Sequence, residues 1–260
     1  MPTRDEMLEI PVDGQVLAGT LITPVTSLPG LLFVHGWGGS QQSYLARARE
    51  IAEMGCVCMT FDLRGHARTD EQRDTASREH NLRDLVAAYD LLVKHPAVEP
   101  GAIGAVGSSY GGYLAAIMTS MRPVRWLALR APALYEDHGW ESPKVQLNEK
   151  MDLNAYRRRL VSPEENRALG ACAAFRGDVL IVESENDDTV PHTVIANYLA
   201  ACTQARSVTS RMLEGAEHGL SDEQWQRAYG VILAKWLAEM MANPEGSRAE
   251  KAPVAPSLIR

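Results

Sequence analysis

The stretch Gly107-Ser108-Ser109-Tyr110-Gly111 places a serine between two glycines, and it is the part of the sequence that decides the fold. An apolar, strand-like run precedes it at 102–106, and a helix-like segment follows over 109–121. A turn this tight crowds the backbone, so only very small residues fit at Gly107 and Gly111. The turn also raises the serine hydroxyl above the sheet edge and aims the N-terminus of the helix at it. Strand, turn and helix together predict a nucleophilic serine.

Two adjacent serines compete for that role. Ser109 is the candidate nucleophile, because centring the pattern on Ser108 would put Val106 and Tyr110 at the two positions that need glycine. A glycine-rich turn that holds a purely structural serine is the alternative interpretation.

Strand-like and helix-like segments alternate along the rest of the chain, which is typical of an α/β fold with a mostly parallel sheet and helices on both faces. The pair Asp13-Gly14 predicts a hairpin at the start of the domain. The expected strands are 8–12, 15–23, 31–34, 56–61, 102–106, 126–130, 179–183 and 207–213, and the expected helices are 41–54, 78–94, 109–121, 194–205 and 223–241.

One catalytic domain is expected over residues 1–242, with a short cap inserted at about 133–173 and a loose C-terminal tail over 243–260. The cap segment is long, irregular and rich in charge, and such segments inside compact domains are usually functional. The tail is rich in Pro, Ala, Ser and charged residues, a composition that does not build a packed core.

Composition excludes several classes of protein. With 260 residues, 45% hydrophobic and 23% charged, the chain is neither a peptide module nor a disordered protein. A net charge of −7 argues against nucleic acid and anionic membranes as partners. No apolar run approaches the ~20 residues of a membrane span, and Met1–Glu6 lacks the apolar part of a secretory signal, so a cytoplasmic location is expected. Four dispersed cysteines predict reduced core residues and no metal site, with Cys56 and Cys58 on one strand face.

A nucleophilic serine needs a base, and the candidate is His218. It lies in the loop 215–219, between the last expected strand and the last expected helix, and so reaches the sheet edge where Ser109 is expected. The other histidines with structural interpretations, near helix ends or in the irregular segment, are His80, His95, His138 and His192.

The base needs an orienting carboxylate. The strand 179–183 leads into a polar loop at the same sheet edge, and its position there favours Asp187 as the acid. Asp188 is the nearest rival, and Glu183 and Glu185 remain further alternatives.

A glycine-rich loop, His35–Gly39, follows the expected strand 31–34. Acyl transfer needs donors placed where negative charge develops on oxygen, and such a loop presents backbone amides without obstruction. The expected oxyanion donors are the amides of Trp37 and Tyr110, with a plain strand-to-helix turn as the alternative for the loop. His35 itself is expected to be a structural hydrogen-bonding residue.

Taken together, these motifs resemble the α/β-hydrolase family. His35–Gly39 resembles its oxyanion loop, Asp62–His66 its D-x-R-G-H stretch and Gly107–Gly111 its nucleophile elbow. Asp187–Pro191 resembles its D-x-x-V-P acid loop, which assigns the acid role to Asp187, and His218 falls where the family has its catalytic histidine. The resemblance implies that the fold is that of an α/β hydrolase.

The resemblance also implies hydrolysis of a small-molecule carboxylic ester through an acyl-enzyme, as in small acyl and feruloyl esterases, without a metal or organic cofactor. Thioesterase and small amidase or peptidase-like activities share the same intermediate. A peptidase of the prolyl oligopeptidase type usually carries a large extra domain, for which 260 residues leave no room. A non-catalytic ligand-binding protein is the alternative of another class.

The cap should determine the choice of substrate. Its aromatic residues Tyr135, Trp140 and Tyr156 are candidates to line an acyl or aromatic pocket, and packing of the cap onto the sheet is the alternative for each. Apolar helix faces could also form a homodimer.

Overall fold

The structure is a computed structural model that describes residues 3–24, 28–147 and 152–242. The strands are β1 (Thr3–Val12), β2 (Gln15–Pro24), β3 (Leu28–Val34), β4 (Val57–Phe61), β5 (Val98–Ser108), β6 (Trp126–Arg130), β7 (Asp178–Asn186) and β8 (Ser207–Glu217). The helices are α1 (Gln42–Glu53), α2 (Arg78–Val93), α3 (Tyr110–Met118), α5 (Leu153–Arg157), α6 (Arg167–Ala174), α7 (His192–Ala201) and α8 (Glu223–Ala242), with short 3-10 turns η1 (Ala67–Gln72), η2 (Lys144–Gln146) and η3 (Pro163–Glu165). The expected tail over 243–260 lies outside the described residues.

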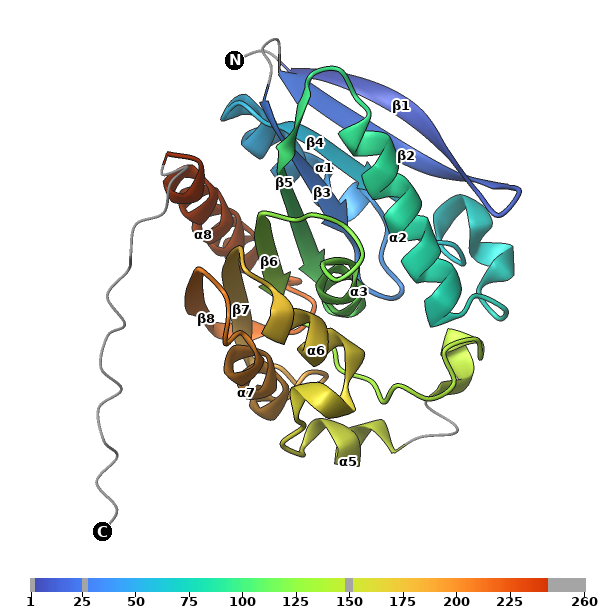
Figure 1. The fold of residues 1–260 in the computed structure, drawn as a ribbon, viewed down its shortest axis with the longest axis vertical. Coiled ribbons are helices and arrows are strands. Elements are labelled where there is room, and N and C mark those ends of the chain that lie inside the picture. Colours follow the sequence, from blue (N-terminus) through green and yellow to red (C-terminus); the bar gives the residue numbers. More distant parts are fainter. Residues whose placement is uncertain (1–2, 25–27, 148–151, 243–260) are drawn as a thin grey trace.

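The described strands form one eight-stranded sheet in the order β1-β2-β4-β3-β5-β6-β7-β8. β1 and β2 pair antiparallel around Asp13 and Gly14, which both have positive φ (49° and 72°), so the predicted hairpin is confirmed. β2 runs antiparallel to β4, and every later pair is parallel. The predicted α/β-hydrolase fold is therefore confirmed, and Figure 1 shows the twisted sheet with helices around it.

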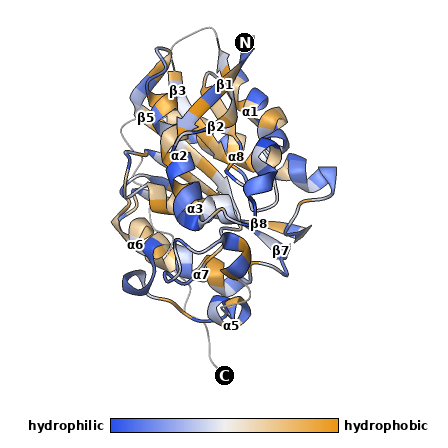
Figure 2. Ribbon diagram, turned by 90° about the vertical axis from the view of Figure 1, so that its right-hand side faces the viewer, coloured by the Kyte–Doolittle hydropathy of each residue, from blue (hydrophilic) through white to orange (hydrophobic). Residues whose placement is uncertain are grey.

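Two hydrophobic cores cover the two faces of this sheet. One core joins α2, α3, α6 and α7 to strand residues such as Leu32 and Met59. The other joins α1 and α8 to residues that point the opposite way, such as Leu31 and Cys58. The alternation follows from the two-residue period of a strand. Cys56 and Cys58 both lie in the second core as buried, free thiols, as predicted from their spacing. Figure 2 shows apolar ribbon concentrated in the central strands.

The segment 133–173 carries no β-strand in its described part, as its sequence pattern predicts, but it is more helical than expected. It contains η2, α5, η3 and most of α6. Asn166 precedes helix α6 and caps it, because its side-chain oxygen accepts from the Ala168 and Leu169 amides. Leu169 and Cys172 then pack into the core against α3. Helices of the described region are all too short or too polar to cross a membrane.

Candidate active site

Ser109 lies at the sharp turn between β5 and α3. Its backbone has φ 51° and ψ −119°, a left-handed conformation that residues with a side chain rarely adopt. The two glycines make the turn possible. A Cβ on Gly107 would lie 2.5 Å from the Gly111 carbonyl oxygen, and a Cβ on Gly111 would lie 2.3 Å from the Val34 carbonyl oxygen. The predicted need for glycine at both positions is therefore confirmed.

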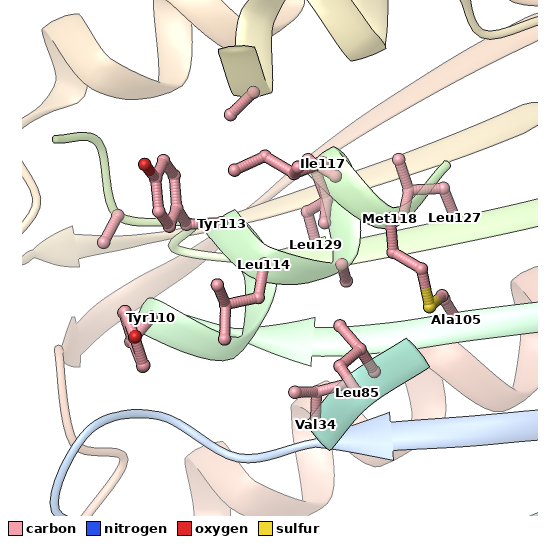
Figure 3. Close-up of a cluster of buried hydrophobic side chains, with 14 of the residues drawn as sticks. Val34, Leu85, Ala105, Tyr110, Tyr113, Leu114, Ile117, Met118, Leu127 and Leu129 are labelled. Atoms are coloured by element: carbon pink, nitrogen blue, oxygen red, sulfur yellow. The ribbon is translucent and has the colours of Figure 1, made fainter. Parts of the chain in front are cut away.

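Helix α3 fixes the turn in space because it is buried on all sides. Figure 3 shows its residues Leu114, Ile117 and Met118 surrounded by side chains from β3, β5, β6 and α2, including Leu85 and Leu129. Its first residue is also held by a polar contact, since the buried Tyr110 hydroxyl donates to Asn81 Oδ1 at 3.0 Å. A rigid helix leaves the serine hydroxyl little freedom relative to the sheet edge.

The structure brings Ser109, His218 and Asp187 together at the carboxyl ends of the strands. Ser109 follows β5, Asp187 follows β7 and His218 follows β8, each by one residue. His218 Nε2 is 3.0 Å from Ser109 Oγ, and His218 Nδ1 is 2.7 Å from Asp187 Oδ2. Nδ1 therefore donates to the carboxylate, which leaves Nε2 free to accept the serine proton.

Asp187 is well placed to stay ionised. Burial alone would raise the pKa of Asp187, but hydrogen bonds from His218 and from the Val190 and Thr189 amides outweigh burial and lower it. Those two amides donate to Oδ1 at 2.7 and 2.9 Å, so the second carboxylate oxygen faces the histidine in a defined orientation. A fixed negative charge beside the imidazole stabilises its protonated form.

The rival carboxylates point elsewhere. Asp188 is exposed and accepts from the Thr189 hydroxyl. Glu183 binds His192 Nδ1 at 2.8 Å, and Glu185 accepts from the Gly215 amide at 2.7 Å. Of the four candidates, the one that contacts His218 is Asp187.

The other histidines have partners that fit structural roles. His80 Nδ1 accepts from the Ser77 amide in the capping box of α2, and His95 Nδ1 accepts from the Ala97 amide. His138 is exposed and lies 3.0 Å from Glu136.

The loop 36–39 lies directly beside the serine. A Cβ on Gly36 would be 3.3 Å from Ser109 Cβ, so a larger residue there would press on the Ser109 side chain. The Trp37 amide, next in the chain, and the Tyr110 amide, at the start of α3, have no hydrogen-bond acceptor within the described residues. Two unused amides beside a serine hydroxyl suit an oxyanion, and their role as its donors stays a prediction.

Two buried histidines hold this loop from below. His35 Nε2 accepts from the Leu63 amide while Nδ1 donates to the Gly36 carbonyl, and His66 Nε2 accepts from the Gly38 amide, at 3.0, 2.8 and 3.0 Å. Both rings must be neutral to accept. Burial lowers the pKa of His35 to about 4, and burial followed by the proximity of His35 lowers the pKa of His66 to about 4. His35 thus has the structural position expected from the sequence.

Two of the three cap aromatics pack against Tyr113 of α3, and the third contacts the cap of α6. Tyr135 meets Tyr113 edge-on at 5.0 Å between ring centroids, and Trp140 stacks on Tyr113 at 6.1 Å. The Tyr156 hydroxyl accepts from Asn166 at 3.1 Å. Each has a packing role, and direct contact with substrate stays a prediction.

Two positively charged residues of the site were not predicted from the sequence. Arg130 is buried and donates to the His218 carbonyl at 2.8 Å and to Ser108 Oγ at 3.1 Å, so it links the histidine loop to the elbow. The sequence signal that could have identified Arg130 is a charged residue at the end of the apolar run 126–130. Lys144 is buried, with Nζ 5.0 Å from the centre of the Trp37 ring; it lies in the irregular cap, where no periodicity marks it.

Protein phosphatase methylesterase 1 of Saccharomyces cerevisiae is 30% identical over 107 residues, which are 37% of this chain and only 27% of that protein. Among solved structures, Est1E of Butyrivibrio proteoclasticus with ferulic acid bound has a TM-score of 0.70 at 18% identity, over 90% of this chain and 99% of that one. Dienelactone hydrolase of Anabaena variabilis has a TM-score of 0.65 at 19% identity, over 91% and 98%. These two likenesses establish the fold.

The family itself is shown by a match over most of the sequence. Residues 42–244 match the prolyl oligopeptidase family, and this range includes the elbow, the acid loop and the histidine loop. The chain, which has the α/β-hydrolase fold, accordingly belongs to the prolyl oligopeptidase family.

Proposed function

We propose that this protein is a serine hydrolase that cleaves small carboxylic esters through Ser109, His218 and Asp187. The observation that carries the proposal is the unbroken line of contacts from Ser109 Oγ to His218 Nε2 (3.0 Å) and from His218 Nδ1 to Asp187 Oδ2 (2.7 Å). A scaffold or ligand receptor has no need of all three groups in this arrangement.

In the first half-reaction, Ser109 Oγ attacks the ester carbonyl carbon while its proton passes to His218 Nε2. The carbonyl electrons move onto oxygen, where the amides of Trp37 and Tyr110 donate to the negative charge. Asp187 stabilises the protonated imidazole. When the tetrahedral intermediate collapses, the alcohol leaves with the proton from Nε2, and the acyl group stays on Ser109.

Water completes the cycle. His218 Nε2 takes a proton from water as the water oxygen attacks the acyl carbon, and the same two amides hold the second oxyanion. Collapse breaks the bond to Ser109 Oγ, which regains the proton, and releases the carboxylic acid. The net change is one ester and one water to one acid and one alcohol.

Two relatives support an ester as the substrate: one is named a methylesterase, and the other has ferulic acid bound. A second candidate is an amide or peptide bond, and the observation that favours it is the match of residues 42–244 to the prolyl oligopeptidase family. Both substrates pass through the same acyl-enzyme, so the contacts of the three residues serve either.

A matched substrate series tests the proposal. Nitrophenyl esters of increasing acyl length, thioesters of the same acyl groups and aminoacyl nitroanilides should give the highest kcat/KM with an ester, and His218→Ala should reduce kcat by about 10⁴-fold or more. Cleavage of nitroanilides alone would move the assignment to amides. Undiminished activity of folded His218→Ala would remove the base from the mechanism.

A further inference from the structure

A cavity of about 250 Å³ lies behind the His218 loop, on the face of the sheet covered by α1 and α8. Ser43 and Arg47 from α1, Ser108 and Arg130 from the strand ends, and Tyr229 from α8 contribute to its walls. None of its described lining residues belongs to the trio proposed for catalysis. Its volume is below the about 300–1,000 Å³ typical of sites for drug-sized ligands, so it suits a small ligand.

Two guanidinium groups line this cavity, and no carboxylate of the described residues is in ion-pair contact with either. Arg47 donates to the Gln226 carbonyl at 3.3 Å and lies 4.5 Å from the centre of the Tyr229 ring. Arg130 donates to Ser108 Oγ and to the His218 carbonyl. Within the described parts of the chain, neither forms an ion pair. Two unpaired cations at one cavity favour a ligand with two negative charges.

Buried donors in the same wall also lack partners. Tyr229 is 1% exposed, and its hydroxyl, which lies near Ser108, has no hydrogen bond of good geometry. Burial raises the pKa of Tyr229 to about 12, so the group keeps its proton and can donate. Arg47 Nε is likewise buried without an acceptor. Buried polar groups are normally satisfied, so these orphaned donors point to an acceptor that belongs here.

The nearest acidic side chains are engaged elsewhere or lie outside. Glu217 accepts from the Gly219 and Ser221 amides, which holds its carboxylate in the histidine loop. Glu50 is exposed on α1 and forms no ion pair with Arg47 in the described structure. The local positive charge also contrasts with the chain as a whole, whose net charge is −7. General attraction of anions is therefore weak, and any saturable binding must come from a local site.

We propose that this cavity is a binding site for a small tetrahedral dianion, a phosphate group either free or as a monoester. Arg47 and Arg130 would donate to its oxygens, because a guanidinium fork matches phosphate geometry. The Tyr229 and Ser43 hydroxyls would supply further donors. Arg130 would then be shared between the anion and the His218 carbonyl, so that the ligand sits directly behind the proposed base.

Calorimetric titration of the full chain tests the site, at constant ionic strength maintained with chloride. The probes are inorganic phosphate and glycerol phosphate, with acetate as a carboxylate of single charge. Saturable binding of one phosphate per chain is expected, with much weaker binding of acetate. Tighter binding of glycerol phosphate would identify the ligand as a monoester, and equal or weaker binding would identify free phosphate. Absence of saturable phosphate binding would overturn the proposal.

A pair of arginines on one helix provides the control. Arg47→Gln should weaken phosphate binding by about tenfold or more, because it removes a charged donor. Arg49→Gln removes the same charge from the exposed face of α1, where Arg49 pairs with Asp5 at 2.7 Å, and should change the Kd by less than about twofold. Equal effects of the two substitutions would show that binding is nonspecific and would refute the site. Tyr229→Phe, which removes only a hydroxyl, should weaken phosphate binding severalfold. If Arg47→Gln does not fold, this variant tests the site in its place.

Discussion

At the scale of single residues, the candidate site depends on strain held in place by close packing. Ser109 has φ 51°, and such a residue persists only where its surroundings determine its conformation. Gly107 and Gly111 permit the close backbone approach, and Gly36 leaves room beside the hydroxyl. The serine is thus presented at one position relative to His218, which is what proton transfer over 3.0 Å requires.

Adjacent aspartates allow the acid to be tested with a matched control. Asp187→Asn should lower kcat by about 10⁴-fold, because an amide at Oδ2 favours the wrong tautomer of His218. Asp188→Asn, one residue away and exposed, should leave kcat within about twofold. Steady-state kinetics on a nitrophenyl ester measure both. Equal losses in the two variants would contradict the assignment of the acid.

At the scale of elements, a buried cation on α2 ties the start of the cap to α2 and α3. Arg78 is fully buried, and its guanidinium donates to the Tyr113 hydroxyl at 3.2 Å, to the Glu136 carbonyl at 2.6 Å and to the His138 carbonyl. These contacts join α2, α3 and the start of the cap. A charge this deep needs hydrogen-bond partners, and the Glu136 and His138 carbonyls supply two of them, so Arg78 orders the segment that follows β6.

Two arginines of α2 test this anchor. Arg78→Met should lower the free energy of unfolding by about 3 kcal/mol, because it leaves a buried hydroxyl and two partly buried carbonyls unpaired. Arg83→Met, on the exposed face with Asp13 as its partner at 3.0 Å, should cost less than about 1 kcal/mol. Urea denaturation measures both, and limited proteolysis should cut Arg78→Met first within 133–147. Similar values for the two variants would argue against an anchor.

Much of the element pattern could be predicted from sequence, because apolar periodicity reports burial directly. The strand 126–130 has the predicted bounds, whereas β5 begins four residues before the predicted start, since Glu99–Gly101 lack apolar periodicity. Helix α6 was missed because its small residues give no clear polar face, although Asn166 was a capping signal. The position of the loop does not by itself decide whether Asp187 or Asp188 is the acid. The two residues are neighbours in one loop, and only the direction of their side chains distinguishes them.

At the scale of the whole molecule, the family match changes what the sequence predicts about the class of substrate. The expectation that 260 residues leave no room for a peptidase of the prolyl oligopeptidase type is corrected by the family match. The match over residues 42–244 shows that the hydrolase domain itself belongs to that family. Amides are therefore, like thioesters, an alternative to esters as the substrate class.

The buried histidines His35 and His66 beneath the loop 36–39 should make the free energy of unfolding depend on pH. The pKa of His35 and of His66 is lowered from 6.5 to about 4 by burial, so between these values the unfolded chain binds more protons than the folded one. The two neutral rings contribute fully to the free energy of unfolding above about pH 6.5. As the pH falls toward 4, this contribution decreases by about 3 kcal/mol for each ring.

Denaturation curves at several pH values measure this dependence. His66→Gln keeps an acceptor for the Gly38 amide but does not titrate, so it should show roughly half of the histidine-linked loss. Subtracting the pH dependence of the variant's free energy of unfolding from that of the wild type removes the contribution of the carboxylates that both proteins share. An unchanged pH slope in the variant would mean that His66 is not held neutral by the fold.

Covalent labelling with a fluorophosphonate tests the central claim most directly, because the reagent reacts only with a serine activated by its neighbours. Intact mass and peptide mapping should show one label per chain, on Ser109. Ser109→Ala should take up no label, whereas Ser108→Ala, which removes the adjacent hydroxyl, should still be labelled. A folded wild-type protein that takes up no label, or a Ser109→Ala variant that is labelled as fully as the wild type, would contradict the account.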